Sequence, residues 1–128
     1  INLLRFYLVQ FIIFGSIVRI GIIPLYNLKA LGFNTVETYV PWNAHEPKEA
    51  TFHFVREFGP GALYQVAQEL DLYVILRPSP FICSEWEFGG LPAWLIEEDL
   101  RIRSSDPAFL EEVARYYDEL LPRGPKYQ

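Results

Sequence analysis

The sequence predicts an α/β fold in which parallel strands alternate with covering helices. Two β-rich runs, 35–40 and 72–76, begin about 37 residues apart, which suits one strand–helix–strand unit. The run 72–76 is continuously apolar rather than alternating, as is typical of parallel strands covered by helices. A loop rich in polar and aromatic residues follows each run. A closed (β/α)8 TIM barrel takes about 250 residues, so the 128 residues are expected to form one incomplete domain with roughly its first three strands.

The N-terminal apolar run from Phe6 to Val18 is expected to supply a buried strand or strands. Arg5 precedes this run, so a signal-peptide core or a membrane anchor are the alternatives. The run is short for a bilayer, Arg19 interrupts its continuation, and no small-residue cleavage site follows it. Because the chain starts at Ile1 rather than Met, we expect it to be a piece of a longer protein.

Three helices are expected from the spacing of apolar residues and from capping signals. The first begins at Pro24 and ends at Gly32, and the third begins at Asp106-Pro107, an N-cap followed by proline. The apolar stripes of the three helices comprise Leu25, Leu28 and Leu31; Leu63, Val66, Ala67 and Leu70; and Phe109, Leu110, Val113, Tyr117, Leu120 and Leu121. Residues 42–49 are expected to be a loop, 51–54 a short extended piece and 92–96 a helical turn.

Composition excludes several classes of function. The net charge is −5, which is unlike the basic surface of a nucleic-acid binder. With one cysteine the chain has no internal disulfide, and the redox compartment stays open. The sequence contains no phosphate-binding glycine loop and no G-x-S-x-G nucleophile motif.

The segment 77–94, RPSPFICSEWEFGGLPAW, concentrates the chemically informative side chains. Glu85 and Glu87 lie two residues apart among tryptophans. Carboxylates accept hydrogen bonds from sugar hydroxyls and indole rings stack on pyranose C–H faces, so this composition suits a sugar site. A solvated or salt-bridged loop is the alternative. The carboxylates of a glycosidase stand about 5–5.5 Å or about 6.5–9.5 Å apart, and spacing in the sequence establishes neither distance.

The strand 35–40 carries Glu37 and Tyr39 on one face near its end. Tyr39 could offer its phenol to a ligand, or could pack its ring and leave the hydroxyl in water. Arg77, at the exit of the next strand, is expected to pair with Glu37.

The loop after the first of these strands contains Trp42, Asn43, His45 and Glu46. His45 and His53 are the two histidines, and no cysteine or aspartate cluster with ligand spacing accompanies them, so a metal site is not favoured. Cys83 has no neighbouring base in the sequence, so a thiol nucleophile is not favoured either.

Several long motifs resemble one family. The segment LKALGFNTVETYVPWNAHEP, residues 28–47, resembles the second-strand signature of family-35 glycoside hydrolases, the β-galactosidases. The segment 77–94 resembles the third-strand signature, and 103–109 and 116–123 continue the similarity. The resemblance covers about Leu28 to Arg123, and the sequences of these motifs look most like those of bacterial members.

This resemblance implies a (β/α)8 catalytic barrel and a retaining double displacement on terminal β-D-galactosyl residues, with no metal or organic cofactor. The implied partner is a β-galactoside oligosaccharide or glycoconjugate; no nucleic acid or membrane partner is expected. Tyr39 and Glu85 match residues that contact galactose. Cys83 and Ser84 match residues that line the same pocket largely through backbone. In bacterial-type sequences without a clear signal peptide, a cytoplasmic location is favoured.

Three departures from the family pattern shape the functional expectation. The Asn-Glu-Tyr-Gly motif with the family's acid/base and the later nucleophilic glutamate are both absent from these residues. The first strand has Val18-Arg19 where the family usually has His-Tyr, and Ser84 stands where alanine is common. The chain alone is therefore expected not to hydrolyse galactosides. Two alternatives are a non-catalytic galactose-binding remnant and a truncated gene product without a role.

Overall fold

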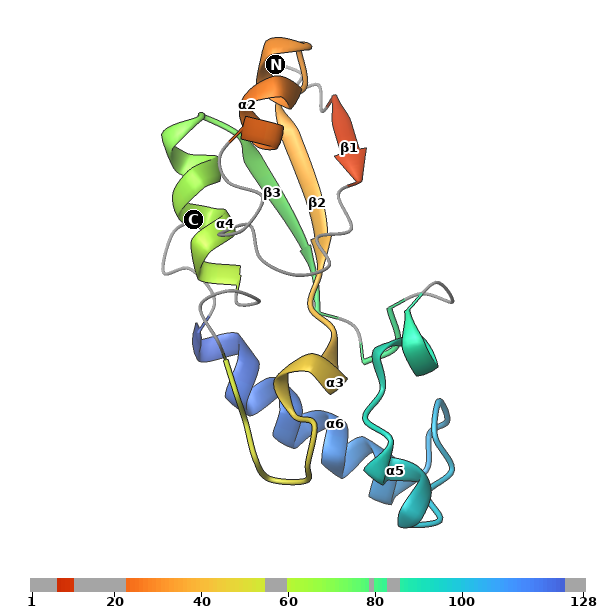
Figure 1. Ribbon diagram of the computed structural model, residues 1–128. Coiled ribbons are helices and arrows are strands. Elements are labelled where there is room, and N and C mark those ends of the chain that lie inside the picture. The colour runs from red at the N-terminus through yellow and green to blue at the C-terminus, as the bar shows by residue number, and fades with distance from the viewer. Residues whose placement is uncertain (1–6, 11–22, 55–59, 79, 83–85, 124–128) are drawn as a thin grey trace, which may run out of the picture. The chain divides into compact units, whose positions relative to one another are not determined.

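The computed structural model describes residues 7–10, 23–54, 60–78, 80–82 and 86–123. The chain divides into two compact units (Figure 1). The first comprises residues 1–39 and 56–77, and the second comprises residues 40–55 and 78–128. None of the helices in the described ranges has the length and apolar character that crossing a bilayer requires.

The first unit contains a parallel three-stranded sheet in the order β1-β2-β3 (Figure 1). The strands are β1 (Leu8–Gln10), β2 (Thr35–Tyr39) and β3 (Tyr73–Arg77). In the register, Thr35 pairs with both Leu8 and Tyr73, and Tyr39 pairs with Arg77. The predicted strands are therefore confirmed, with β3 one residue later than expected. Of the predicted N-terminal run, Phe6 and residues 11–18 lie outside the described ranges, as does Arg19.

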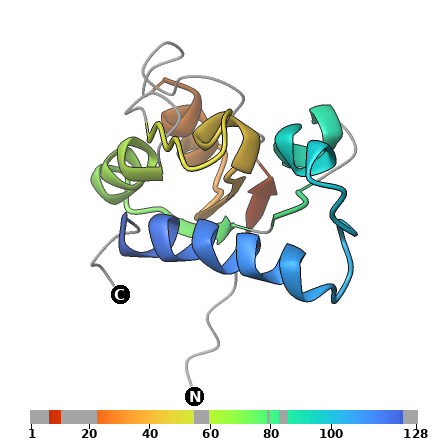
Figure 2. The ribbon, with the colours of Figure 1, turned by 90° about the horizontal axis from the view of Figure 1, so that it is seen from below.

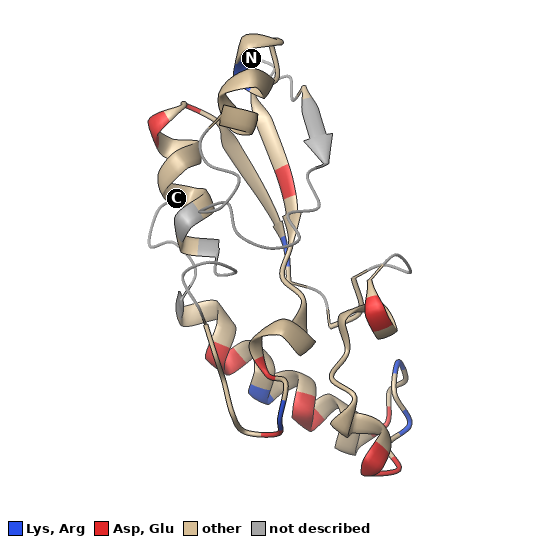
Figure 3. Cartoon of the chain, in the orientation of Figure 1, with Lys and Arg blue, Asp and Glu red and all other residues tan. Residues whose placement is uncertain are grey.

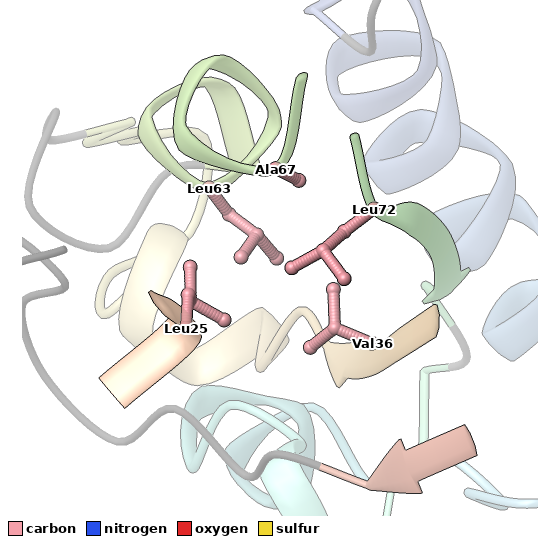
Figure 4. Packing of buried hydrophobic residues seen from close by; sticks show 5 residues of the cluster. All are labelled: Leu25, Val36, Leu63, Ala67 and Leu72. Carbon is pink, nitrogen blue, oxygen red and sulfur yellow. The ribbon is translucent and has the colours of Figure 1, made fainter. Parts of the chain in front are cut away.

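The helices α2 (Ile23–Ala30) and α4 (Pro60–Glu69) join these strands and share one core with them. Figure 4 shows the buried cluster at their centre, formed by Leu25, Val36, Leu63, Ala67 and Leu72. Burying a side chain of this kind stabilises the fold by about 1.5–3 kcal/mol. Residues of both helices share one buried cluster with Val36 of β2, which places both helices on the same face of the sheet (Figure 4). A doubly wound sheet instead has helices on both faces.

The other face of β3 differs from the expectation of a fully buried strand. Tyr73 and Ile75 are 50% and 40% exposed, whereas Val74 packs against the core cluster. Alternate side chains point to opposite faces of a strand, so a continuous apolar run in the sequence does not show whether both faces are covered.

Both helices of the first unit end in the same backbone motif. Gly32 has φ +92°, its N–H bonds to the Lys29 carbonyl, and the Phe33 N–H bonds to the Leu28 carbonyl. These are the two bonds of a Schellman motif, and the predicted stop at Gly32 is confirmed. Asp71, with φ +52°, has the same role after α4, and the Leu72 N–H bonds back to the Ala67 carbonyl. Leu72 therefore belongs to the helix end, which explains the later start of β3.

The second unit is built from short helices and one long helix. These are α3 (Trp42–His45), η1 (Glu87–Gly90), α5 (Trp94–Glu97), α6 (Pro107–Leu120) and η2 (Leu121–Arg123). The helical turn expected near 92–96 is confirmed as α5. The prediction of a loop over 42–49 is wrong for α3, where the Glu46 N–H bonds to the Trp42 carbonyl. In the piece expected to be extended, Thr51 forms an isolated bridge with Lys48.

Helix α6 begins as predicted, and its buried face matches the predicted stripe only in part. Asp106 accepts a hydrogen bond from the Ala108 N–H at 3.0 Å, and Figure 2 shows α6 as one uninterrupted helix. Leu110 and Leu121 are 48% and 59% exposed, so their assignment to the buried stripe is wrong. The buried residues Phe109, Tyr116 and Leu120 follow the i, i+7, i+11 spacing of one face. Acidic side chains outnumber basic ones along α6 (Figure 3).

Candidate functional site

The carboxyl edge of the β2–β3 pair brings a phenol and a guanidinium together. Tyr39 and Arg77 are register partners at the ends of their strands. Arg77 Nη1 donates a hydrogen bond to the Tyr39 hydroxyl oxygen at 2.6 Å. The guanidinium carbon of Arg77 also lies 4.6 Å from the centre of the Tyr39 ring, within cation–π range. Arg77 thus contacts both the polar and the aromatic part of the phenol.

Glu37 completes this group of side chains. It lies two residues before Tyr39 on the same strand, and its Oε1 accepts from Arg77 Nη1 at 3.2 Å, which confirms the predicted pair. The Glu37 side chain is 13% exposed and that of Arg77 is 43% exposed. An ion pair this open to solvent contributes only about 0–1 kcal/mol to stability. Its main effect is to fix the direction of the guanidinium.

Tyr39 is half-buried at the edge where its sequence position placed it. Parallel strands commonly present ligand-binding groups at their carboxyl ends. Cys83, Ser84 and Glu85, the other residues expected to bind substrate, lie outside the described residues. The contact of all four residues with a sugar stays a prediction.

The segment after Glu85 is fastened to α3 by Asn43. The Trp86 indole N–H donates to Asn43 Oδ1 at 2.8 Å, and Asn43 Nδ2 donates to the Glu87 carbonyl at 3.3 Å. Both functions of the Asn43 amide are therefore directed at the start of η1. The Glu87 side chain is exposed. Sequence reasoning named Asn43 as a loop residue but gave no sign of this connection.

The turn of η1 also depends on a close packing contact. Gly89 has φ +63°, and a Cβ there would collide with the Phe81 ring. The guanidinium carbon of Arg103 lies over the same Phe81 ring, 3.9 Å from its centre. A side chain at position 89 would displace Phe81, so glycine is required for this turn.

Glu46 is the charged centre of the second unit and has no exposed surface. Its carboxylate accepts hydrogen bonds from the Trp42 indole N–H at 2.6 Å and from the Ala50 N–H at 2.8 Å. Arg115 Nη1 donates to the same carboxylate at 2.6 Å. A buried carboxylate needs such partners, because an unpaired charge in the interior lowers the stability of the fold by roughly several kcal/mol.

Two of the three tryptophans belong to this core rather than to a sugar-binding surface. Trp42 and Trp94 are 0% and 8% exposed, and their rings meet edge to face with centres 6.0 Å apart. The Trp94 indole N–H donates to the Glu46 carbonyl at 3.2 Å, and Tyr116 stacks on Trp42 with centres 4.7 Å apart. The expectation that the tryptophans of the segment 77–94 suit a sugar site is therefore wrong for Trp94, and Trp42 is a core residue as well. Trp86 is half-buried.

Arg115, which no sequence signal singled out, shapes the electrostatics of this core. Burial alone would lower the pKa of Arg115, but hydrogen bonds to Glu112 and Glu46 outweigh it and raise the pKa. The cation therefore stays charged. Burial also raises the pKa of Tyr116, whose hydroxyl donates to the Val40 carbonyl at 3.2 Å.

The two histidines differ in their surroundings. His45 is fully buried and stacks on Phe54 with ring centres 5.2 Å apart. Neither of its ring nitrogens has a hydrogen-bond partner among the described residues, and burial lowers its pKa. His53 is exposed. Within the described ranges, no three His, Cys, Asp or Glu side chains are grouped to hold a metal ion.

Comparison with known proteins places these features in a family context. The sequence pattern of glycosyl hydrolases family 35 matches residues 23–128. Beta-galactosidase-1-like protein 3 of Homo sapiens is 44% identical over 122 residues, covering 89% of this chain and 19% of that protein. Beta-galactosidase of Homo sapiens is 48% identical over 100 residues, covering 77% and 15%. Beta-galactosidase 8 of Oryza sativa subsp. japonica is 42% identical over 120 residues, covering 88% and 18%.

The chain thus spans less than a fifth of the length of these relatives. Among solved structures, GH5_18 from Streptomyces cattleya, crystallised with GlcNAc, superposes with a TM-score of 0.61 at 24% identity. The superposition covers 83% of this chain and 25% of that one. At this level of identity the similarity shows a shared fold.

Proposed function

Because the chain belongs to glycosyl hydrolases family 35, we propose that it forms part of a β-galactosidase that removes terminal β-D-galactosyl residues with retention. The family match carries this proposal, since it runs through both strand-end segments that hold the candidate site. The substrate is a β-galactoside oligosaccharide or glycoconjugate, and the chemistry needs two carboxylates rather than a cofactor.

The fold that serves this activity is proposed to be the opening part of a (β/α)8 barrel. Three consecutive parallel strands in the order β1-β2-β3, with both connecting helices in one core, support a barrel rather than a doubly wound sheet. In a barrel the face of β3 that carries Tyr73 and Ile75 points inward and is covered by further strands. This accounts for two large apolar side chains on an open face.

Recognition of galactose is assigned to Tyr39, Glu85, Cys83 and Ser84. The position of Tyr39 at the carboxyl edge of β2 supports its part in this assignment. Glu85 would accept hydrogen bonds from sugar hydroxyls, and such charge-assisted bonds are stronger than neutral ones. A site built on them rejects a sugar in which that hydroxyl is missing or inverted.

The 128 residues are proposed to bind substrate only as part of the enzyme, without carrying the two reacting glutamates. The purified chain is expected to release no chromophore from a nitrophenyl β-galactoside, whereas human Beta-galactosidase serves as the positive control. Turnover by the chain that disappears on changing Glu37→Gln or Glu85→Gln alone would contradict this division of roles.

A non-catalytic galactose-binding protein is the second candidate, because the recognition residues lie within the chain. Titration of galactose against tryptophan fluorescence separates the two, with glucose as the matched control. A saturable change with galactose alone supports the binding protein, and Tyr39→Phe should then weaken it. No saturable change supports a chain that needs the remaining strands of the barrel.

A further inference from the structure

We propose that Arg103 is a positioning residue that closes the neck of the loop 82–89. The neck consists of residues 81–82, where the chain enters the loop, and residues 89–90, where it leaves. The closure of the neck is argued from contacts within the second unit. Its consequence for galactose rests on the proposed function, because Glu85 lies within this loop in the sequence.

The backbone joins the two limbs of the neck. The Ile82 N–H donates to the Gly89 carbonyl at 2.8 Å, and the Gly89 N–H donates to the Trp86 carbonyl at 2.8 Å. Gly89 and Gly90 have φ +63° and +87°, values that glycine adopts readily and other residues rarely. A Cβ at position 90 would lie 3.0 Å from Cγ1 of the buried Ile82 side chain. The backbone bond from Ile82 to Gly89 thus crosses the neck, and side-chain packing around it completes the closure.

The Phe81 ring fills the space beside Gly89. A Cβ at position 89 would collide with the edge of this ring, so the ring lies directly against the backbone of the departing limb. The guanidinium carbon of Arg103 lies 3.9 Å from the ring centre, well within the range of about 6 Å for a cation over an aromatic face. Arg103 therefore covers the ring whose edge meets Gly89, and it does so from the segment just before α6.

The backbone conformation of Arg103 is costly for an arginine. Its φ is +56°, in the left-handed region that favours glycine and asparagine. Among the described residues, no carboxylate forms an ion pair with Arg103, whereas the Phe81 ring is a contact that a glycine would lose. A position selected only for the shape of its backbone would be better served by glycine. The strained arginine therefore points to a role of the side chain.

The neck is one of two attachments of this loop. The other is Asn43, which contacts the Trp86 indole and the Glu87 carbonyl. The two attachments flank residues 83–85 in the sequence. A group that binds a sugar hydroxyl has to be held within about 0.5 Å of its productive position. Loosening the neck should therefore weaken the recognition that is proposed for Glu85.

The first experiment measures amide hydrogen exchange by NMR and involves no sugar. The amide protons of Ile82 and Gly89 report local opening of the neck, and that of Tyr116, within α6, reports unfolding of the chain. Arg103→Met should quicken exchange of both neck amides about two- to fivefold relative to the Tyr116 amide. Arg103→Lys keeps the cation without the planar group and should retain part of the protection. Arg101→Met, at an exposed position, is the matched control and should leave the rates unchanged.

Arg103→Gly separates the side chain from the backbone at this position. Glycine adopts a φ of +56° without strain. If Arg103 only shaped its turn, exchange at the neck would be unchanged or slower in this variant. The proposal predicts faster exchange of the Ile82 and Gly89 amides in spite of the relieved backbone. Unchanged or slower exchange of both amides in Arg103→Met and Arg103→Gly would overturn the proposal.

The second experiment adds galactose to the same proteins and follows tryptophan fluorescence, with glucose as the matched control. Arg103→Met should bind galactose about two- to fivefold more weakly than the wild type, and Arg103→Lys should lie between them. Equal binding by all three proteins would overturn the consequence for the galactose site. Absence of saturable binding by the wild type would count against the proposed function, while the exchange rates would still decide the role of Arg103 at the neck.

Discussion

Arg115 and Glu46 are 69 positions apart in the sequence, yet their side chains meet at 2.6 Å in the second unit. The contact joins α6 to the residue that follows α3. Glu46 is wholly buried, whereas the Arg115 side chain is 30% exposed. The carboxylate therefore depends on the arginine far more than the arginine depends on the carboxylate.

Removing one member of this pair should be strongly destabilising. Arg115→Met leaves the Glu46 charge with two neutral donors, Trp42 and Ala50. We expect the free energy of unfolding to fall by about 3 kcal/mol, which is the lower end of the range for removing one partner of a buried ion pair. Urea unfolding followed by circular dichroism measures it, with Glu111→Gln on the exposed side of α6 as the charge control. A change below about 1 kcal/mol would show that the pair behaves as a surface salt bridge.

Asn43 offers a second prediction, because its amide makes two different bonds. Asn43→Asp keeps an acceptor for the Trp86 indole but loses the donor to the Glu87 carbonyl, and Asn43→Leu loses both. Each lost bond should cost about 1 kcal/mol. Exchange of the Trp86 indole proton should therefore quicken strongly in Asn43→Leu and little in Asn43→Asp. Asn27→Leu, at an exposed position, is the control and should leave the exchange rate unchanged. Equal exchange rates of the Trp86 indole proton in Asn43→Leu, Asn43→Asp and Asn27→Leu would refute the role of Asn43.

The first unit could be predicted from the sequence because its signals are local. Pro24 and Gly32 mark the helix between β1 and β2, and the spacing from Leu63 to Leu70 marks α4. The ion pair between Glu37 and Arg77 could also be predicted, since parallel neighbouring strands bring their ends together.

The second unit could be predicted less well, because long-range contacts decide it. The α3 turn is held by the hydrogen bond between the Trp42 indole and the Glu46 carboxylate. The buried face of α6 is set by the stacking of Tyr116 on Trp42. Neither contact has a local signature in the sequence. The same contacts explain why Trp94, which lies in the segment whose composition suited a sugar site, is a core residue together with Trp42.

Two glycines should respond to the same substitution with opposite signs. Gly32 has φ +92° and Gly61 lies in α4, and a Cβ at either position would meet no atom within 4 Å. Packing is therefore unaffected and the backbone decides. Gly32→Ala should destabilise the chain by about 1 kcal/mol, whereas Gly61→Ala should stabilise it by up to about 1 kcal/mol. Thermal unfolding of both variants tests this, and a shift in the same direction would contradict the Schellman motif at the end of α2.

His45 predicts how stability depends on pH. Burial lowers the pKa of His45 in the folded chain, whereas the unfolded chain takes up a proton near pH 6.5. The unfolded state thus binds more protons below that value, and stability falls as the pH drops through it. Between pH 7.5 and 5.5 the contribution of His45 should be a loss of about 1 kcal/mol.

His45→Phe keeps a flat ring against Phe54 and removes both ring nitrogens that lack partners in the described structure. The His45→Phe variant should lose less stability than the wild type between pH 7.5 and pH 5.5. The His53→Gln variant, changed at an exposed position, retains His45 and should lose as much stability as the wild type. Urea unfolding at both pH values compares the three proteins. Because acidic groups titrate in all of them, the difference between the wild type and His45→Phe isolates the histidine. An identical pH dependence in these two would mean that His45 gains a proton as readily in the folded chain as in the unfolded one.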